Sequence, residues 1–150
     1  MTHPDLEPKD DGFVVDTISD VSCLIDYLRD ANASLGSHPE HGGTVYILTS
    51  SQDREHQLLA GVRGERGSLV WATDQVMYVP SVGINDDYVD YFTATDVDYN
   101  QPPHSEVPIE TVYAVVEEFH RTRTRPESVE WVAPPTSARV SQSIDDLLFG

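Results

Sequence analysis

The chain has 150 residues, of which 26 are Asp or Glu and 9 are Lys or Arg, so its formal net charge is −17 with neutral histidines. This charge argues against direct binding to nucleic acid or to an anionic membrane surface, because both would repel the protein. Hydrophobic residues make up 39% of the chain, which is too much apolar material for a disordered acidic tail and predicts a folded core.

Both ends of the sequence read as polar extensions of one domain. We expect a flexible arm over residues 1–12, a single domain over 13–135 and a tail over 136–150 whose last apolar residues form an amphipathic stretch. The arm lacks the pattern of a signal peptide, and no apolar run approaches the length of a membrane helix. With only Cys23 available, no intramolecular disulfide forms. We therefore expect a cytoplasmic protein.

The first elements are a short strand and a helix. Phe13, Val14 and Val15 form a short apolar run that predicts a strand. Apolar residues then recur at helical spacing, which predicts a helix over 18–32 with Thr17 or Ser19 as its N-cap. Residues 32–43 are rich in Gly, Ser, His and Pro and have no periodicity, so they predict a loop.

From residue 44 the hydrophobic period changes to two. Five short runs rich in β-branched and aromatic residues predict consecutive strands at 44–49, 57–63, 68–73, 76–82 and 88–95. Glycine-containing segments at 64–67 and 83–87 are the clearest hairpin connections. We therefore expect an antiparallel meander.

A second helix and a last strand complete the predicted fold. Pro108 suits the first helical position, and an apolar stripe follows at Ile109, Val112, Val115, Val116 and Phe119. Pro126 ends the helical region, and residues 128–132 read as a strand with Val129 and Trp131 on one face. The predicted class is α+β, with an antiparallel sheet of about five or six strands and two helices packed on one face.

Motifs for metal binding and catalysis are weak. His38 and His41 stand three residues apart, but their Gly- and Pro-rich surroundings lack the helix and third ligand of a zinc site. Residues 96–107 start like a calcium loop, yet Gln101 and Val107 occupy its decisive positions. No nucleophile has an adjacent base, and Cys23 lies inside the first helical pattern. We expect no catalytic site, metal or cofactor.

The distribution of charge is more informative than the total. Residues 67–120 contain ten acids and no Lys or Arg, and the densest part, 86–100, interleaves five aspartates with aromatic residues. Two interpretations remain open: a surface for an Arg- or Lys-rich partner, and a solvated strand edge whose aromatics pack the sheet. Alternation places Val89, Tyr91 and Thr93 on one side of this strand, and Tyr88, Asp90 and Phe92 on the other. The candidate partner-binding residues are Asp86, Asp87, Tyr88, Asp90, Asp96, Asp98 and Tyr99.

The only basic cluster follows the second helix. Arg121, Arg123 and Arg125 are expected to complement the negative end of the helix dipole and some of the acids.

The order of elements also carries a family resemblance. The C-terminal sequence pattern consists of Val107-Pro108-Ile109-Glu110-Thr111-Val112, Ala114, Glu118, Phe119, Arg125-Pro126 and Val129-Glu130-Trp131. Upstream stand Leu58-Leu59-Ala60-Gly61-Val62 and Gly67-Ser68-Leu69-Val70-Trp71. Together these segments, within about residues 15–132, resemble the immunity protein 1 family of bacterial polymorphic toxin systems. The family often has a glycine after the helix, where this chain has Arg123.

The resemblance implies a small α+β protein that binds a cognate secreted toxin in the producer's cytoplasm and blocks it by stoichiometric occlusion, without enzymatic activity. Such proteins frequently neighbour nucleic-acid deaminase toxins, and a toxin of this kind would be basic. Pro108, Phe119, Pro126 and Trp131 would be fold determinants. Two alternatives stay open: a halophile's acidic housekeeping domain unrelated to toxins, and a small enzyme that uses carboxylates.

Overall fold

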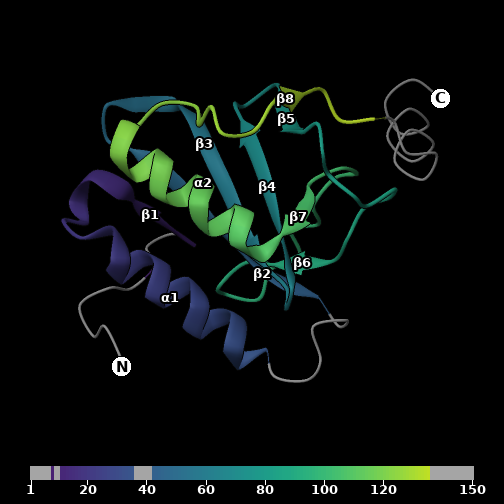
Figure 1. The fold of residues 1–150 in the computed structure, drawn as a ribbon, viewed down its shortest axis with the longest axis horizontal. Helices are drawn as coiled ribbons and strands as arrows, with labels where there is room; N and C mark the ends of the chain where they lie inside the picture. The colour runs from purple at the N-terminus through teal and green to yellow at the C-terminus, as the bar shows by residue number, and fades with distance from the viewer. Residues whose placement is uncertain (1–7, 9–10, 36–41, 136–150) are drawn as a thin grey trace.

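The computed structural model describes residues 8, 11–35 and 42–135. These residues form an α+β fold in which two helices lie on one side of a mixed sheet (Figure 1). The sheet order is β1-β2-β3-β4-β5-β8, with β6 paired to β2 and β7 paired to β4. The predicted fold class and the packing of both helices on one face are confirmed. The predicted C-terminal tail lies outside the described residues.

The first strand is confirmed, whereas the first helix begins later than predicted. Strand β1 spans Gly12–Val14, and the short 3-10 helix η1 spans Val15–Thr17. Helix α1 spans Val21–Ser34 and is capped by Asp20, whose side chain accepts a hydrogen bond from the Ser22 N–H at 3.0 Å. Thr17 and Ser19 are therefore not the N-cap. The hydroxyl of Thr17 donates instead to the carbonyl of Val14, the residue before η1.

The four central strands form the expected antiparallel meander. They are β2 (Gly43–Ser50), β3 (Asp53–Val62), β4 (Arg66–Ala72) and β5 (Met77–Pro80). At the turn between β3 and β4, Gly64 has a φ of 74°, a conformation that glycine adopts without steric cost. The hairpin predicted at 64–67 is thus confirmed.

The fifth predicted strand does not continue the meander. Only β6 (Tyr91–Phe92) forms within 88–95, and it pairs in parallel with β2 rather than beside β5. Strand β1 is also parallel to β2, which makes the sheet mixed. The hairpin predicted at 83–87 is wrong, because the chain leaves the sheet after β5 and the Ile84 N–H donates to the Glu106 carbonyl at 2.9 Å. Alternating hydrophobicity shows which side chains of a strand face the core, but it does not show which strand is the neighbour.

The C-terminal elements follow the predicted order. Strand β7 (Glu106–Pro108) leads into helix α2 (Ile109–Thr122), with Pro108 as its N-cap. Strand β8 (Trp131–Val132) pairs with β5 and is shorter than the predicted strand at 128–132. Trp131 is half-buried against the core under the helices, and its indole N–H donates to the Pro126 carbonyl at 2.7 Å.

Two hydrophobic clusters lie on opposite faces of the sheet. The larger cluster lies between the sheet and the helices and includes Trp71 and Phe119, whose rings meet edge to face at 5.7 Å. The smaller cluster lies on the opposite face, which we call the helix-free face. Its buried members are Val45, Leu59, Val70, Ala72, Val79 and Tyr91.

Candidate functional site

The acid-rich segment folds into an irregular hairpin on the helix-free face. We call residues 86–101 the acidic hairpin. Isolated bridges pair Val89 with Gln101 and Phe92 with Asp98, and the Thr93 N–H donates to the Val97 carbonyl to close the turn. The hairpin therefore has two short arms that join at residues 93–97.

The inner side of the acidic hairpin packs on the sheet. Tyr91 is fully buried, and Val89 and Tyr99 are half-buried against the smaller hydrophobic cluster. Burial raises the pKa of the Tyr91 and Tyr99 phenols. Gly43 and Gly61 leave room for the Tyr91 ring, because a Cβ on either glycine would lie 2.5 Å from its Cε2. The predicted alternation along this strand is confirmed.

The outer side carries the aspartates. Asp86, Asp87, Asp90, Asp96 and Asp98 are all exposed, and Tyr88 is half-buried. Asp86 and Asp87 lie where the hairpin begins, whereas Asp96 lies in its turn. Tyr99 is not among the outer residues, since its ring packs inward. Of the seven candidate residues, the structure therefore places the five aspartates at the surface. Tyr88 is half-buried on the outer side, and Tyr99 packs inward.

Two side chains anchor the ends of the acidic hairpin. Asp11 Oδ1 accepts hydrogen bonds from the backbone N–H and the hydroxyl of Thr95, at 3.1 and 2.9 Å. At the opposite end, Asn85 Nδ2 donates to the carbonyls of Asp87 and Pro102, each at 2.9 Å. The hairpin is thus tied to the chain before β1 and to the segment before β7.

A partly buried ion pair lies beneath the acidic hairpin. Glu106 is only 1% exposed, and it accepts hydrogen bonds from Arg63 Nε and Nη2 at 2.7 and 2.8 Å. Its Oε2 also accepts a hydrogen bond from the Tyr91 hydroxyl at 2.8 Å. The bond to Glu106 raises the pKa of the Arg63 guanidinium. The sequence placed Glu106 among the acids of the cation-free stretch. In the structure Glu106 is buried, and its charge is paired with that of Arg63, the residue after β3.

Sequence reasoning missed this pair because Arg63 and Glu106 are 43 residues apart. The inward alternation of Tyr91 was the one available signal that a buried hydroxyl needed a partner. A second acid of the same stretch is also paired: Glu110 lies 3.3 Å from Arg29 in an exposed ion pair between α2 and α1. The negative surface of this region therefore consists mainly of the hairpin.

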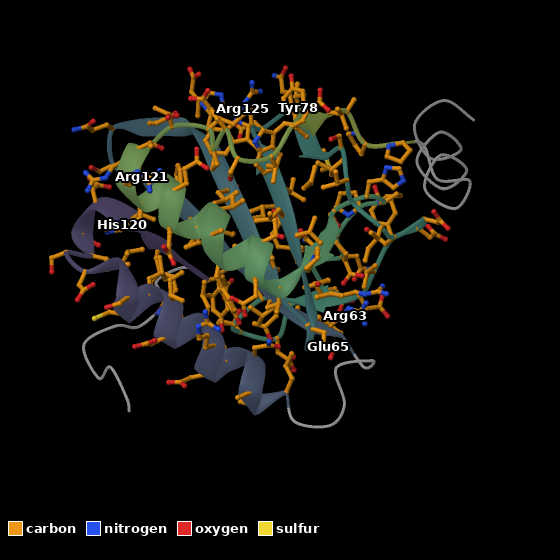
Figure 2. The ribbon with its side chains drawn as sticks, in the orientation of Figure 1. Arg63, Glu65, Tyr78, His120, Arg121 and Arg125 are labelled. Carbon is orange, nitrogen blue, oxygen red and sulfur yellow. The ribbon has the colours of Figure 1, made fainter. Side chains whose placement is uncertain are left out.

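The basic cluster lies at the other end of α2. Arg123 follows the helix with a φ of 61°, and its backbone N–H donates to the Phe119 carbonyl at 2.7 Å. Its Nε donates to the His120 carbonyl, so the predicted role at the helix C-terminus is confirmed for this residue. The Arg125 guanidinium lies 6.0 Å from the Tyr78 ring centre. Figure 2 shows Arg121 at one end of α2 and Arg63 toward the other end in this view.

The described residues contain no group of three or more His, Cys, Asp or Glu side chains placed to hold a metal ion. His38 and His41 lie outside these residues. The calcium-like segment begins in the hairpin turn, where Asp96 has a φ of 70°. Cys23 is a half-buried free thiol on α1. Among the helices described, none is long and apolar enough to cross a membrane.

Comparison with known protein families identifies a family to which most of the chain is similar. A family model described as immunity protein Imm1 matches residues 9–133, which is most of the chain. No curated protein matches the chain.

Proposed function

The chain belongs to the immunity protein Imm1 family, and from this premise we propose that it neutralises a cognate secreted toxin by stoichiometric occlusion of the toxin's active site. The family is one of immunity proteins, which supports an inhibitory role. Inhibition by occlusion requires a complementary surface and no catalytic group. The protein acts in this proposal as a cytoplasmic, non-enzymatic inhibitor without a cofactor.

The acidic hairpin is the proposed toxin-binding surface. Its outer side presents five exposed carboxylates within one compact element, and the sheet supports that element from beneath. Val97, in its turn, is 57% exposed and supplies an apolar contact among the acids. Productive interfaces combine such apolar contact with polar groups that set orientation and association rate.

Charge complementarity points to the class of toxin. A toxin that acts on DNA or RNA binds phosphates with a positive cleft, and an acidic hairpin is steered into such a cleft. The proposed target is therefore a basic nucleic-acid-modifying domain, with a deaminase as the leading candidate. The hairpin carboxylates would stand where the phosphates of the substrate bind.

The single observation that carries this proposal is the exposure of all five aspartates on one anchored hairpin. The test changes Asp86, Asp87, Asp90, Asp96 and Asp98 to Asn and measures binding to an inactivated toxin domain from the adjacent reading frame. We expect at least about a 100-fold rise in Kd, mostly through a lower association rate, together with a weaker salt dependence.

A matched variant controls for the change in net charge. It converts five exposed acids outside the hairpin to amides: Glu55, Asp74, Glu117, Glu127 and Glu130. This variant should lose much less affinity. Equal losses in the two variants would show that only total charge matters, and an unchanged Kd in the hairpin variant would show that the toxin binds elsewhere.

A further inference from the structure

The ion pair between buried Glu106 and partly exposed Arg63 has no direct part in the toxin-binding proposal. Charged side chains are rarely buried unless they are paired, and a buried ion pair often contributes no more stability than apolar residues of the same volume. Where such pairs are kept, one attested role is to fix a particular conformation. The contacts of Glu106 show which conformation this pair fixes.

Glu106 reaches the acidic hairpin through its side chain. Its Oε2 accepts the Tyr91 hydroxyl at 2.8 Å, while the Tyr91 ring fills the space that Gly43 and Gly61 leave open. Tyr91 is therefore held at both its ring and its hydroxyl. Because successive strand residues point to opposite faces, a fixed Tyr91 also fixes the direction of its neighbour Asp90.

Glu106 also reaches the start of the acidic hairpin through its backbone. Its N–H donates to Asn85 Oδ1 at 2.8 Å, and its carbonyl accepts from the Ile84 N–H at 2.9 Å. The same Asn85 side chain bonds the Asp87 and Pro102 carbonyls, which lie on the two sides of the hairpin. One residue thus holds both the start and the middle of the acidic hairpin.

We propose that Glu106, held by Arg63, is a positioning residue that keeps the acidic hairpin in its toxin-binding conformation through Tyr91 and Asn85. This inference rests on the proposed function for the identity of the bound surface, whereas the ordering of the hairpin is a property of the free protein. An element ordered before binding loses less conformational entropy when it binds, so its order contributes to affinity.

The first test is amide hydrogen exchange of the free full-length chain carrying Tyr91→Phe, which removes only the hydroxyl. Four hairpin amides report on local opening: Val89, Thr93, Tyr99 and Gln101, whose N–H groups bond within the hairpin. Tyr91→Phe removes the hydrogen bond from Tyr91 to the Glu106 carboxylate, so these four amides should exchange about tenfold faster. The amides of β3 and β4 should keep their exchange rates. Tyr46→Phe is the matched control, since it removes a buried hydroxyl on the helix-covered face.

The second test separates positioning from charge by means of the inactivated toxin domain. Tyr91→Phe should slow association several-fold and leave the salt dependence of the rate unchanged, because no charge has been removed. The five Asp→Asn changes should instead reduce the salt dependence. Glu106→Gln, which keeps the side-chain volume but weakens both the Arg63 and Tyr91 contacts, should give a larger hairpin effect than Tyr91→Phe.

The outcomes distinguish the two proposals. Hairpin amides that exchange no faster in Tyr91→Phe than in Tyr46→Phe would overturn the positioning role. A second outcome would also overturn it: the hairpin amides of Tyr91→Phe exchange faster but its association with the toxin is unchanged, although the five Asp→Asn changes do weaken toxin binding. If the Asp→Asn variant binds normally, the proposed toxin-binding surface is wrong, and the binding part of the positioning role falls with it.

Discussion

The two faces of the sheet are built on different physical principles. The helix-covered face holds one large apolar cluster, whose buried members include residues of α1, α2 and the strands β1, β2, β3, β4 and β7. The helix-free face has a smaller apolar cluster, covered by an irregular hairpin whose position depends on Asn85, Asp11 and the Glu106 network. Apolar packing gives one face its stability, whereas specific hydrogen bonds give the other a defined surface.

The largest expected effect concerns the helix-covered face. Phe119→Ala removes a ring that is 1% exposed and packs on Trp71, so it should lower the free energy of unfolding by about 3–5 kcal/mol. Urea denaturation followed by tryptophan fluorescence measures this loss. The hairpin amides should exchange faster only through global unfolding. A loss below about 1 kcal/mol would mean that α2 contributes little to the core.

A smaller effect is expected beneath the acidic hairpin. Gly61→Ala places a Cβ 2.5 Å from Tyr91 Cε2 and 2.3 Å from Ser68 Oγ, so Tyr91 must move. Overpacking of this kind costs about 1–3 kcal/mol, and here we expect it to loosen the hairpin more than the central strands. Hydrogen exchange compares the two regions. In a Tyr91→Leu background, Gly61→Ala should lower the free energy of unfolding by less. If the losses of the two substitutions simply added, the Tyr91 ring would not be the cause of the overpacking.

The smallest expected effect is a gain in stability. Arg123 follows α2 in the left-handed conformation with a φ of 61°, which glycine adopts without steric cost. Arg123→Gly should therefore raise the free energy of unfolding by about 0.5–1 kcal/mol and leave hairpin exchange unchanged. Arg123→Ala is the control, because it loses the Nε bond to His120 but keeps the strained backbone. Thermal unfolding of both variants should show the gain only with glycine.

The same comparison explains what the sequence could predict. Helix α2 and strands β2 to β5 follow from periodic apolar residues, because each of these elements buries one stripe or one face in a continuous core. The class of fold and the alternation around Tyr91 follow from the same patterns. The start of α1 was misplaced, because Ile18 fits the helical spacing yet lies in extended backbone after η1.

The helix-free face was harder to predict because its contacts join distant parts of the chain. Arg63 and Glu106 carry no local signal of their pairing, and Glu106 looked like one acid among ten. The parallel pairing of β6 with β2 depends on space left by Gly43 and Gly61, which a hydrophobic pattern does not encode. The exposure of Asp90, by contrast, followed from its alternation with the inward residues Val89 and Tyr91.

The pairing along the outer edge of β2 affects how the protein behaves at high concentration. Two short strands share its outer edge: β6 pairs with Gly43 and Thr44, and β1 pairs with Ile47, Leu48 and Thr49. The outermost strands in the sheet order are then β1 and β8, of three and two residues. Edge strands this short offer little template for another chain to extend the sheet. In the described part of the chain, the strand pairing itself thus guards against edge-to-edge aggregation and leaves the aspartates of the acidic hairpin exposed.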